Sequence, residues 1–182
     1  MLKTQRLILR RWRESDRDPF AQMNADAEVM EYFPARLSRQ ESDALIGQLE
    51  RHHQEYGFGL WAVEEASTQA FVGLIGLNTP KFQAHFTPTV EVGWRLASPF
   101  WRKGYATEGA RRAISYGFDV IGLPEIVSFT AKSNQRSIAV MKRLGMTYRE
   151  VDDFDHPRLP SGHALQRHVL YRLKRNSGCV KR

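Results

Sequence analysis

Trp101-Arg-Lys-Gly-Tyr-Ala-Thr-Glu108 is the stretch of sequence on which the fold prediction depends. The strand-like run Thr89-Val-Glu-Val-Gly-Trp-Arg-Leu96 precedes it, and a helical pattern opens immediately after Gly104. A helix N-terminus offers unpaired N–H groups and a partial positive charge, which suit a pyrophosphate. Gly104 has no Cβ and lets the backbone approach a ligand closely, and Arg102 and Lys103 add two cations. The turn is therefore predicted to bind phosphate.

The composition is that of an ordinary soluble globular protein. Of the 182 residues, 42% are hydrophobic and 26% are charged, which suits one domain with a sizeable core. The apolar runs are far shorter than a bilayer span, and the N-terminus shows no signal-peptide core. One cysteine, Cys179, precludes an internal disulfide and fits a reducing compartment. We therefore expect a cytoplasmic protein that does not associate with a membrane.

The net charge of +7 is concentrated at the C-terminal end. Residues 174–182 hold four basic residues and no acids, which leaves +3 for the rest of the chain. Signs alternate along that remainder, as on a solvated surface rather than in a basic groove. A nucleic-acid-binding protein is therefore the weaker alternative. We predict a single domain over residues 1–174 and a basic, disordered tail over residues 175–182, in a monomer or a homodimer.

The order of the predicted elements indicates a mixed-sheet α/β protein. The helix over residues 38–56 has the best-defined start, because Ser38 and Glu41 form a capping box. The predicted strands are 6–10, 60–63, 71–77, 89–96, 125–131, 146–154 and 166–173, and the other predicted helices are 15–25, 106–118 and 134–145.

A second segment, Asn134-Gln-Arg-Ser-Ile-Ala-Val-Met-Lys-Arg-Leu-Gly-Met146, begins 30 residues after Gly104. Its pattern places Asn134 as a helix N-cap, Ser137 in the first turn and Met141 on an apolar stripe. Many helix starts look like this, so the segment gains meaning only from its combination with the basic turn.

Together the two segments resemble the GNAT superfamily of acyl-CoA-dependent N-acetyltransferases, especially the RimJ/RimL-like branch that acetylates protein N-termini. The resemblance runs from Thr4-Gln-Arg-Leu-Ile-Leu-Arg10 to His168-Val-Leu-Tyr-Arg-Leu173 and includes Val90-Glu-Val-Gly-Trp94. It implies a mixed, mostly antiparallel sheet of about six to seven strands, flanked by helices, which splays between residues 89–96 and 125–131. Acetyl-CoA would lie in that V, because strands that part leave N–H and C=O groups unpaired.

The resemblance also implies which residues bind acetyl-CoA. The backbone of the central strand would bind the pantetheine arm, the amides of the basic turn would bind the pyrophosphate, and the start of the last helix would face the arm near the sulfur. The predicted cofactor-binding residues are Trp94, Arg95, Leu96, Arg102, Lys103, Gly104, Tyr105, Ala106, Thr107, Asn134 and Ser137. No metal ion is expected.

Two positions depart from the superfamily pattern. The basic turn often begins with Gln or Arg, where this chain has Trp101, although RimJ/RimL-like members tolerate an aromatic residue there. Many relatives carry a tyrosine general acid seven residues after Asn134, where this chain has Met141. Methionine cannot donate a proton. A non-catalytic acyl-CoA-binding module is therefore an open alternative.

Acetyl transfer requires a neutral amine, a stabilised oxyanion and a leaving thiolate. Glu91 is the candidate general base, acting through water, because the family often has a glutamate here. Its alternative role is a strand glutamate that faces solvent or pairs with Arg95. A backbone N–H near Trp94 or Arg95 would hold the oxyanion. Ser137 is the candidate hydrogen-bond donor to the thiolate, and its alternative role is simple helix-terminus bonding.

The predicted acceptor is a protein or peptide α-amine, because its pKa of about 7.7–8.0 requires only a weak base, whereas lysine at about 10.4 requires more help. A small-molecule amine is the alternative. The aspartates of the loop 152–168 are expected to attract a cationic amine, and the loop's histidines fit no known metal spacing. Residues 31–34 and Trp12 either line the acceptor site or are core aromatics.

Overall fold

A nine-stranded mixed sheet runs through the computed structural model, which describes residues 1–175. Its order is β1-β2-β3-β4-β5-β6-β9-β7, with β8 also paired to β9, and only the β5–β6 contact is parallel. The strands are β1 (Leu2–Lys3), β2 (Leu7–Arg10), β3 (Leu60–Glu65), β4 (Phe71–Asn78), β5 (Glu91–Leu96), β6 (Glu125–Ala131), β7 (Thr147–Tyr148), β8 (Phe154–Asp155) and β9 (Arg167–Lys174). The mixed, mostly antiparallel architecture is confirmed, and the strand count exceeds the prediction because three strands have only two residues.

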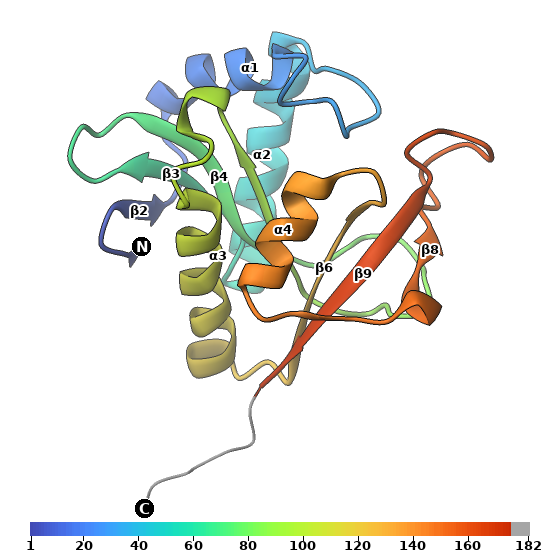
Figure 1. The fold of residues 1–182 in the computed structure, drawn as a ribbon. Coiled ribbons are helices and arrows are strands. Elements are labelled where there is room, and N and C mark those ends of the chain that lie inside the picture. Colours follow the sequence, from blue (N-terminus) through green and yellow to red (C-terminus); the bar gives the residue numbers. More distant parts are fainter. Residues whose placement is uncertain (176–182) are drawn as a thin grey trace, which may run out of the picture.

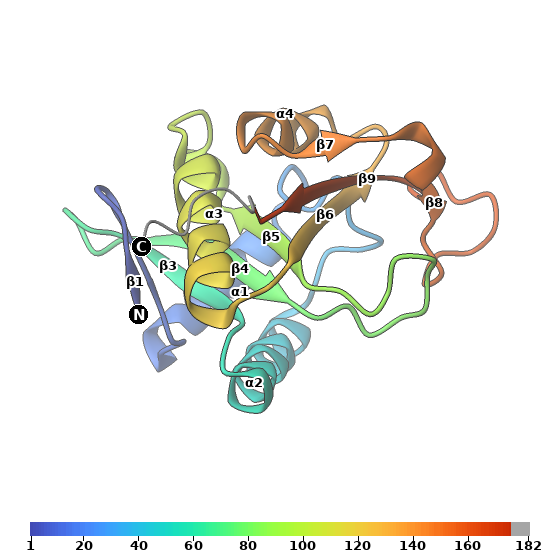
Figure 2. The same cartoon turned by 90° about the horizontal axis from the view of Figure 1, so that it is seen from below.

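Helices cover both faces of this sheet (Figure 1 and Figure 2). One face carries α1 (Arg17–Ala25) and α2 (Arg39–Tyr56), and the other carries α3 (Tyr105–Tyr116) and α4 (Gln135–Arg143). The capping box predicted for α2 is present, with Glu41 N–H donating to the Ser38 hydroxyl. All four predicted helices therefore form, and α3 continues into a π-helical turn at Gly117–Ile121.

The predicted strand over residues 146–154 forms only near its two ends, as β7 and β8, which both pair with β9. A 3-10 turn at Glu150–Asp152 separates them. The Asp152 carboxylate accepts a hydrogen bond from Arg172 Nε at 3.1 Å, which holds this turn against β9. The side-chain contact therefore replaces continuous strand pairing.

The sheet splays between β5 and β6, the pair of strands that the family resemblance implied. A single ladder pair, Glu91 with Val127, joins β5 to β6, supported by a hydrogen bond from Val127 N–H to Val90 O at 3.0 Å. Beyond this pair the two strands diverge, and the edge of β5 that faces β6 has no strand partner (Figure 2). The fold thus opens at the point that the sequence predicted.

Two apolar layers sandwich the sheet and fix the direction of each side chain. Alternation along the strands sends Val92 and Leu96 into the larger layer, beneath α3 and α4, together with the fully buried Met141. Leu74 joins the smaller layer beneath α1 and α2, with Phe20. The α1–α2 face of β5 therefore carries Glu91 and Arg95.

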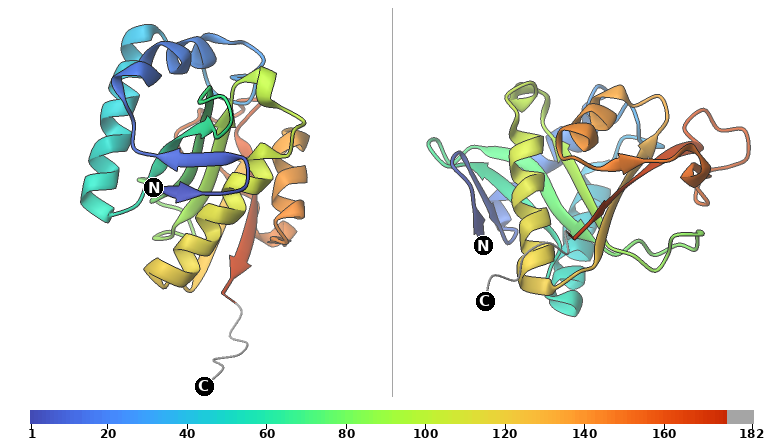
Figure 3. Two further views of the ribbon diagram at one scale, coloured as in Figure 1. Left: turned by 90° about the vertical axis from the view of Figure 1, so that its left-hand side faces the viewer. Right: turned by 60° about the horizontal axis from the view of Figure 1, so that its bottom comes forward.

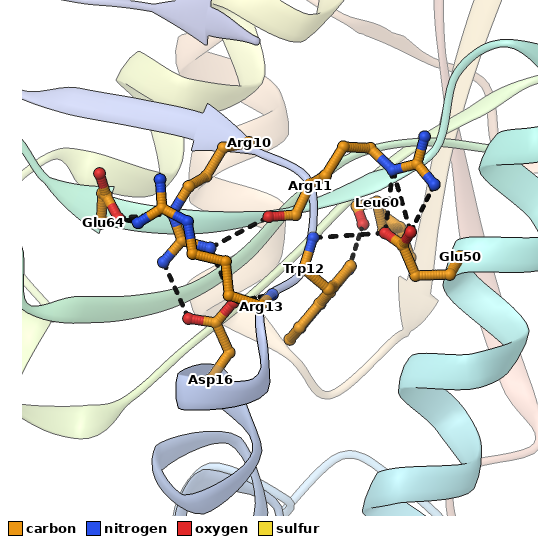
Figure 4. A network of polar contacts seen from close by, with 8 residues as sticks. All are labelled: Arg10, Arg11, Trp12, Arg13, Asp16, Glu50, Leu60 and Glu64. Atoms are coloured by element: carbon orange, nitrogen blue, oxygen red, sulfur yellow. Dashed lines mark hydrogen bonds and ion pairs between the residues drawn. The ribbon is translucent and has the colours of Figure 1, made fainter.

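A network of ion pairs anchors α1 and α2 to the sheet (Figure 4). The buried Arg10 guanidinium donates to both carboxylate oxygens of Asp16, at 2.7 and 2.8 Å, and to Glu64 at 2.5 Å. Removing one member of such a buried group typically costs about 3–5 kcal/mol of stability. Trp12 donates from its indole to Leu60 O at 3.0 Å and packs edge-on against Phe20, so it is a core aromatic.

The first strands contact the start of α3 (Figure 3). At the other end, Arg175 N–H donates to Pro124 O at 2.9 Å. The rest of the predicted tail, residues 176–182 with Cys179, lies outside the described residues. Within residues 1–175, no helix is long and apolar enough to cross a membrane.

Candidate active site

A cleft of about 1080 Å³ opens where β5 and β6 part. Its walls come from β5, the basic turn, the first turn of α4, β6, the segment before α2 and the loop after β8. Glu91 and ten of the eleven predicted cofactor-binding residues line it. Lys103 does not, and its ammonium lies 5.1 Å from the Phe100 ring centroid. The cleft thus brings together residues that the sequence spreads from 91 to 137.

The basic turn presents main-chain donors at one end of this cleft. Gly104 is the N-cap of α3 with φ +81°, a left-handed conformation that favours glycine, and Arg102 is also left-handed at φ +60°. No side chain caps α3. The first amides of the helix, at residues 105–107, are therefore free of a side-chain partner and suit an anion.

An ion pair that the sequence reasoning missed holds the turn in place. Glu108 accepts hydrogen bonds from Thr4 Oγ1 at 2.6 Å and from Arg6 Nε at 2.7 Å. The Arg6 side chain also donates to Lys103 O at 3.0 Å. The contacts draw the one carboxylate of the turn toward the N-terminal strands. Both residues belong to the stretches that carry the family resemblance, but nothing in their spacing predicts the pairing.

Trp101 connects the turn to its neighbours. Its indole N–H donates to Leu96 O at 2.7 Å, and the Arg136 guanidinium of α4 lies 4.5 Å from its ring centroid. Arg136 also pairs with Glu28 at 3.5 Å and with Glu31. The aromatic residue that departs from the superfamily pattern thus helps to join β5, α4 and the segment before α2.

The start of α4 presents one hydroxyl to the cleft. Asn134 Oδ1 accepts from Ser137 N–H at 3.1 Å, and Asn134 Nδ2 donates to Ser137 Oγ at 3.2 Å. Because the Ser137 oxygen accepts this bond, its own proton is available to another acceptor. Met141 is buried in the core rather than in the cleft. Ser137, and not the position of the missing tyrosine, therefore faces the open space.

Glu91 is a half-buried carboxyl that lines the cleft at the ladder pair where β5 and β6 begin to part. Burial raises its pKa to about 7, and the hydrogen bond from Asn78 Nδ2 at 2.8 Å and the charge of Arg158 oppose this rise. Within residues 1–175 it has no ion-pair partner, so the alternative pairing with Arg95 does not form. Its pKa lies near neutral pH, as suits a general base.

Arg95 lies on the same face of β5, because residues of equal parity in a strand point to one side. Nη1 donates to Asn24 Oδ1 at 2.6 Å, and the guanidinium carbon lies 4.0 Å from the Phe33 ring centroid. Burial lowers the pKa of Arg95 to about 10. The sequence predicted only its backbone as a ligand contact, whereas the structure also brings its side chain to the cleft.

The wall opposite β5 combines two distant segments. Tyr32, Phe33 and Pro34 line the cleft, as one of the two interpretations of residues 31–34 predicted. The loop after β8 contributes His156, Arg158, Leu159 and Leu165, and β9 adds His168. The two imidazoles are 4.9 Å apart, and burial lowers the pKa of His156 to about 4. The His156 ring is therefore neutral near pH 7, and burial also lowers the pKa of His168.

Asp152, Asp153 and Asp155, which precede or lie in β8, do not line the cleft, so their predicted attraction for a cationic amine would act only at a distance and stays a prediction. Asp152 pairs with Arg172 at 3.1 Å and Asp155 with Arg167 at 3.3 Å, while Asp153 lies 3.7 Å from Lys132. Nearby cations neutralise these carboxylates in place. Within residues 1–175, no three His, Cys, Asp or Glu side chains are grouped to hold a metal ion.

The site belongs to a known fold. The spermidine N-acetyltransferase of Vibrio cholerae, solved with CoA and spermine, superposes with a TM-score of 0.72 at 19% identity, over 94% of this chain and 96% of that one. The ribosomal-protein-S5-alanine acetyltransferase of Vibrio fischeri gives 0.75 at 17% identity, over 96% of each chain. The likenesses concern the fold.

Sequence comparison gives the family. The N-acetyltransferase YoaA of Bacillus subtilis is 27% identical over 147 residues, which cover 80% of this chain and 81% of YoaA. The acetyltransferase (GNAT) domain family matches residues 6–147, a range that includes β5, the basic turn and the whole of α4. The chain belongs to the GNAT acetyltransferase family.

Proposed function

We propose that this chain transfers an acetyl group from acetyl-CoA to an amine, by direct attack in a ternary complex, and that the amine is a protein or peptide N-terminal α-amine. One observation carries the proposal: the same cleft is lined by free helix-terminal amides of α3 and by Glu91, a carboxyl of near-neutral pKa where β5 and β6 part. The CoA in the structurally similar spermidine N-acetyltransferase supports the choice of donor.

The residues present fit acetyl-CoA. The unpartnered edge of β5 offers main-chain groups to the amide-containing pantetheine arm, and the N-terminus of α3 offers donors to the pyrophosphate. Arg102 adds a cation at the same end. When bound, the thioester supplies an activated acetyl carbon.

The chain's own groups then handle the protons and the charge. Glu91, directly or through water, takes a proton from the amine as the new N–C bond forms. A backbone N–H of β5 near Trp94 or Arg95 holds the oxyanion. As the C–S bond breaks, the Ser137 hydroxyl donates a hydrogen bond to the thiolate. A thiol pKa of about 8.5 makes a hydrogen bond sufficient for departure.

An α-amine suits this base better than lysine does. A carboxyl of pKa about 7 is close to the α-amine value of about 7.7–8.0, and it lies about three units below that of lysine. The proton transfer from an α-amine is therefore the less unfavourable of the two.

Two measurements test the proposal in sequence. Titration calorimetry with acetyl-CoA comes first, and failure to bind would contradict the proposed donor. A thiol-release assay follows, with peptides that have a free or a blocked α-amine and with small amines such as spermidine. We expect turnover of the free peptides. Binding without turnover of any amine would favour the non-catalytic module, and turnover confined to polyamines would replace the proposed acceptor.

A further inference from the structure

Arg95 is a cation without a counter-charge on the α1–α2 side of the cleft, next to Asn24 and Phe33. Within residues 1–175 no carboxylate lies within ion-pair distance of it, and Asn24 is its one hydrogen-bond partner. Its Nε is shielded from solvent and has no partner. A guanidinium that stacks on a ring, as this one does on Phe33, keeps its N–H donors directed outward along its edge. The group is therefore held ready for an acceptor from outside the chain.

The charged residues that line the cleft also favour an acceptor with a negative group. Five arginines but only two carboxylates line the cleft. Without Arg102 of the basic turn and the paired Arg136, three arginines remain, namely Arg95, Arg143 and Arg158. One of these carboxylates, Glu28, is paired with Arg136 at 3.5 Å. The other, Glu91, lies close enough to Arg158 that this arginine lowers its pKa. A site for a polycation would require an excess of acids, whereas this one has an excess of cations.

We propose that the acceptor is an amine that also carries a carboxylate, and that Arg95 binds this carboxylate while Glu91 faces the amine. The proposal rests on the proposed acetyl transfer and adds the chemical class of the acceptor. Guanidinium and carboxylate form paired N–H···O bonds, which makes arginine the residue best suited to this recognition.

The spacing of the two residues fits such a molecule. They are four positions apart on one strand, so their Cα atoms are separated by about 13 Å at about 3.3 Å per residue. Both side chains are long, so their charged groups can lie closer together over the cleft than their Cα atoms do. A short peptide with a free C-terminal carboxylate and a protein N-terminus with an acidic side chain both offer this chemistry.

Matched acceptor pairs test the proposal without changing the protein. One pair is a dipeptide and its C-terminal amide, and the other is a longer C-amidated peptide that begins with Asp or with Asn. The full chain is assayed for thiol release with acetyl-CoA. We expect kcat/KM to be at least about tenfold higher for the carboxylate member, the effect of one charge-assisted hydrogen bond. Preference in the dipeptide pair alone would indicate a small acceptor, and preference in the Asp/Asn pair alone a protein N-terminus.

Variants then assign the preference to Arg95. Arg95→Gln should bring the ratio within each pair toward one, and Arg95→Lys, which keeps the charge but loses the planar donor pair, should retain part of it. Arg51→Gln, an exposed arginine of α2 outside the cleft, should retain all of it. If Arg95→Gln fails to fold, judged by circular dichroism, the pairs and the lysine variant still decide.

Failure of this proposal is separable from failure of the proposed function. Equal rates within both pairs, or a preference that survives Arg95→Gln, would overturn the role of Arg95 and leave acetyl transfer standing. If no acceptor turns over, calorimetry of the same pairs in the presence of CoA decides. Arg95-dependent binding of the carboxylate member would support the acceptor class and contradict catalysis, and binding of neither member would overturn the acceptor class.

Discussion

The two ends of the cleft are built in different ways. The end proposed for the cofactor is a continuous run of main chain, residues 101–107, in which two left-handed residues precede free helix amides. The end proposed for the acceptor consists of side chains from segments far apart in the sequence, among them Phe33, Arg95 and Arg158. A site made of main chain depends on backbone conformation and on what a Cβ would displace. A site made of side chains depends on the identity of each residue.

The largest expected effect tests the main-chain end. Gly104→Glu places a negative charge beside the free amides, and it should weaken acetyl-CoA binding on the order of 100-fold, the equivalent of one or two charge-assisted hydrogen bonds. Calorimetry measures the change. Gly122→Glu is the matched control, because Gly122 has the same φ of +81° and open space around its missing Cβ. Unchanged affinity in Gly104→Glu would remove the pyrophosphate from this turn.

The next largest effect is expected at Glu91, the carboxyl that lines the cleft. Glu91→Gln should lower kcat by roughly 100-fold, the lower part of the range for general-base catalysis, and leave acetyl-CoA affinity nearly intact. The control is Glu150→Gln, an exposed glutamate outside the cleft.

The pH dependence of the activity gives a second test of Glu91, because the direction of the change can be predicted. Below its pKa of about 7 Glu91 is protonated and cannot accept a proton, so activity should rise with pH through about 7. The α-amine titrates separately at about 7.7–8.0. The lower inflection should disappear in Glu91→Gln and persist in Glu150→Gln. A rate that does not depend on Glu91 at any pH would exclude it as the base.

The same contrast explains how far sequence reasoning reached. The capping box of α2 depends on a local Ser–Glu pair, and the splayed sheet followed from the family resemblance of local motifs such as the basic turn, so both were predictable. The ion pair between Arg6 and Glu108, 102 positions apart, depends on how the N-terminal strands pack against α3. No local pattern encodes such a distance.

The acceptor end was harder to predict, because some charged residues of this region line the cleft and others, close to them in sequence, do not. Asp152 and Asp155 were expected to attract a cationic amine, yet both lie outside the cleft in ion pairs with β9, while Arg158 of the loop after β8 lines it. Burial also shifts the pKa values of the site, raising that of Glu91 and lowering that of Arg95. Burial at a given position emerges only from the packed fold.

A smaller effect is expected at the start of α4, where the two ends meet. Ser137→Ala removes a hydroxyl that faces the cleft, and it should lower kcat by up to about tenfold, the effect of one hydrogen bond to the leaving thiolate. Steady-state kinetics should show little change in the KM for acetyl-CoA. Ser133→Ala, an exposed serine just before Asn134 that does not line the cleft, is the control. An unaltered kcat in Ser137→Ala would leave this serine with only its role at the helix terminus.

The smallest effect concerns Arg136, the residue that bridges the two ends. Its guanidinium lies over Trp101 of the basic turn and pairs with Glu28 and Glu31 on the acceptor wall. Because the side chain is 46% exposed, each ion pair contributes only about 0–1 kcal/mol and is weakened by salt.

Arg136→Gln should therefore lower the free energy of unfolding by about 1 kcal/mol or less, measured in urea. It should raise KM about threefold for both substrates together, because the same cation contacts both walls. Lys142→Gln, which changes an exposed cation of the same helix away from the cleft, should raise neither KM. A change in only one KM would show that the main-chain end and the side-chain end are independent, whereas a parallel change would show that Arg136 couples them.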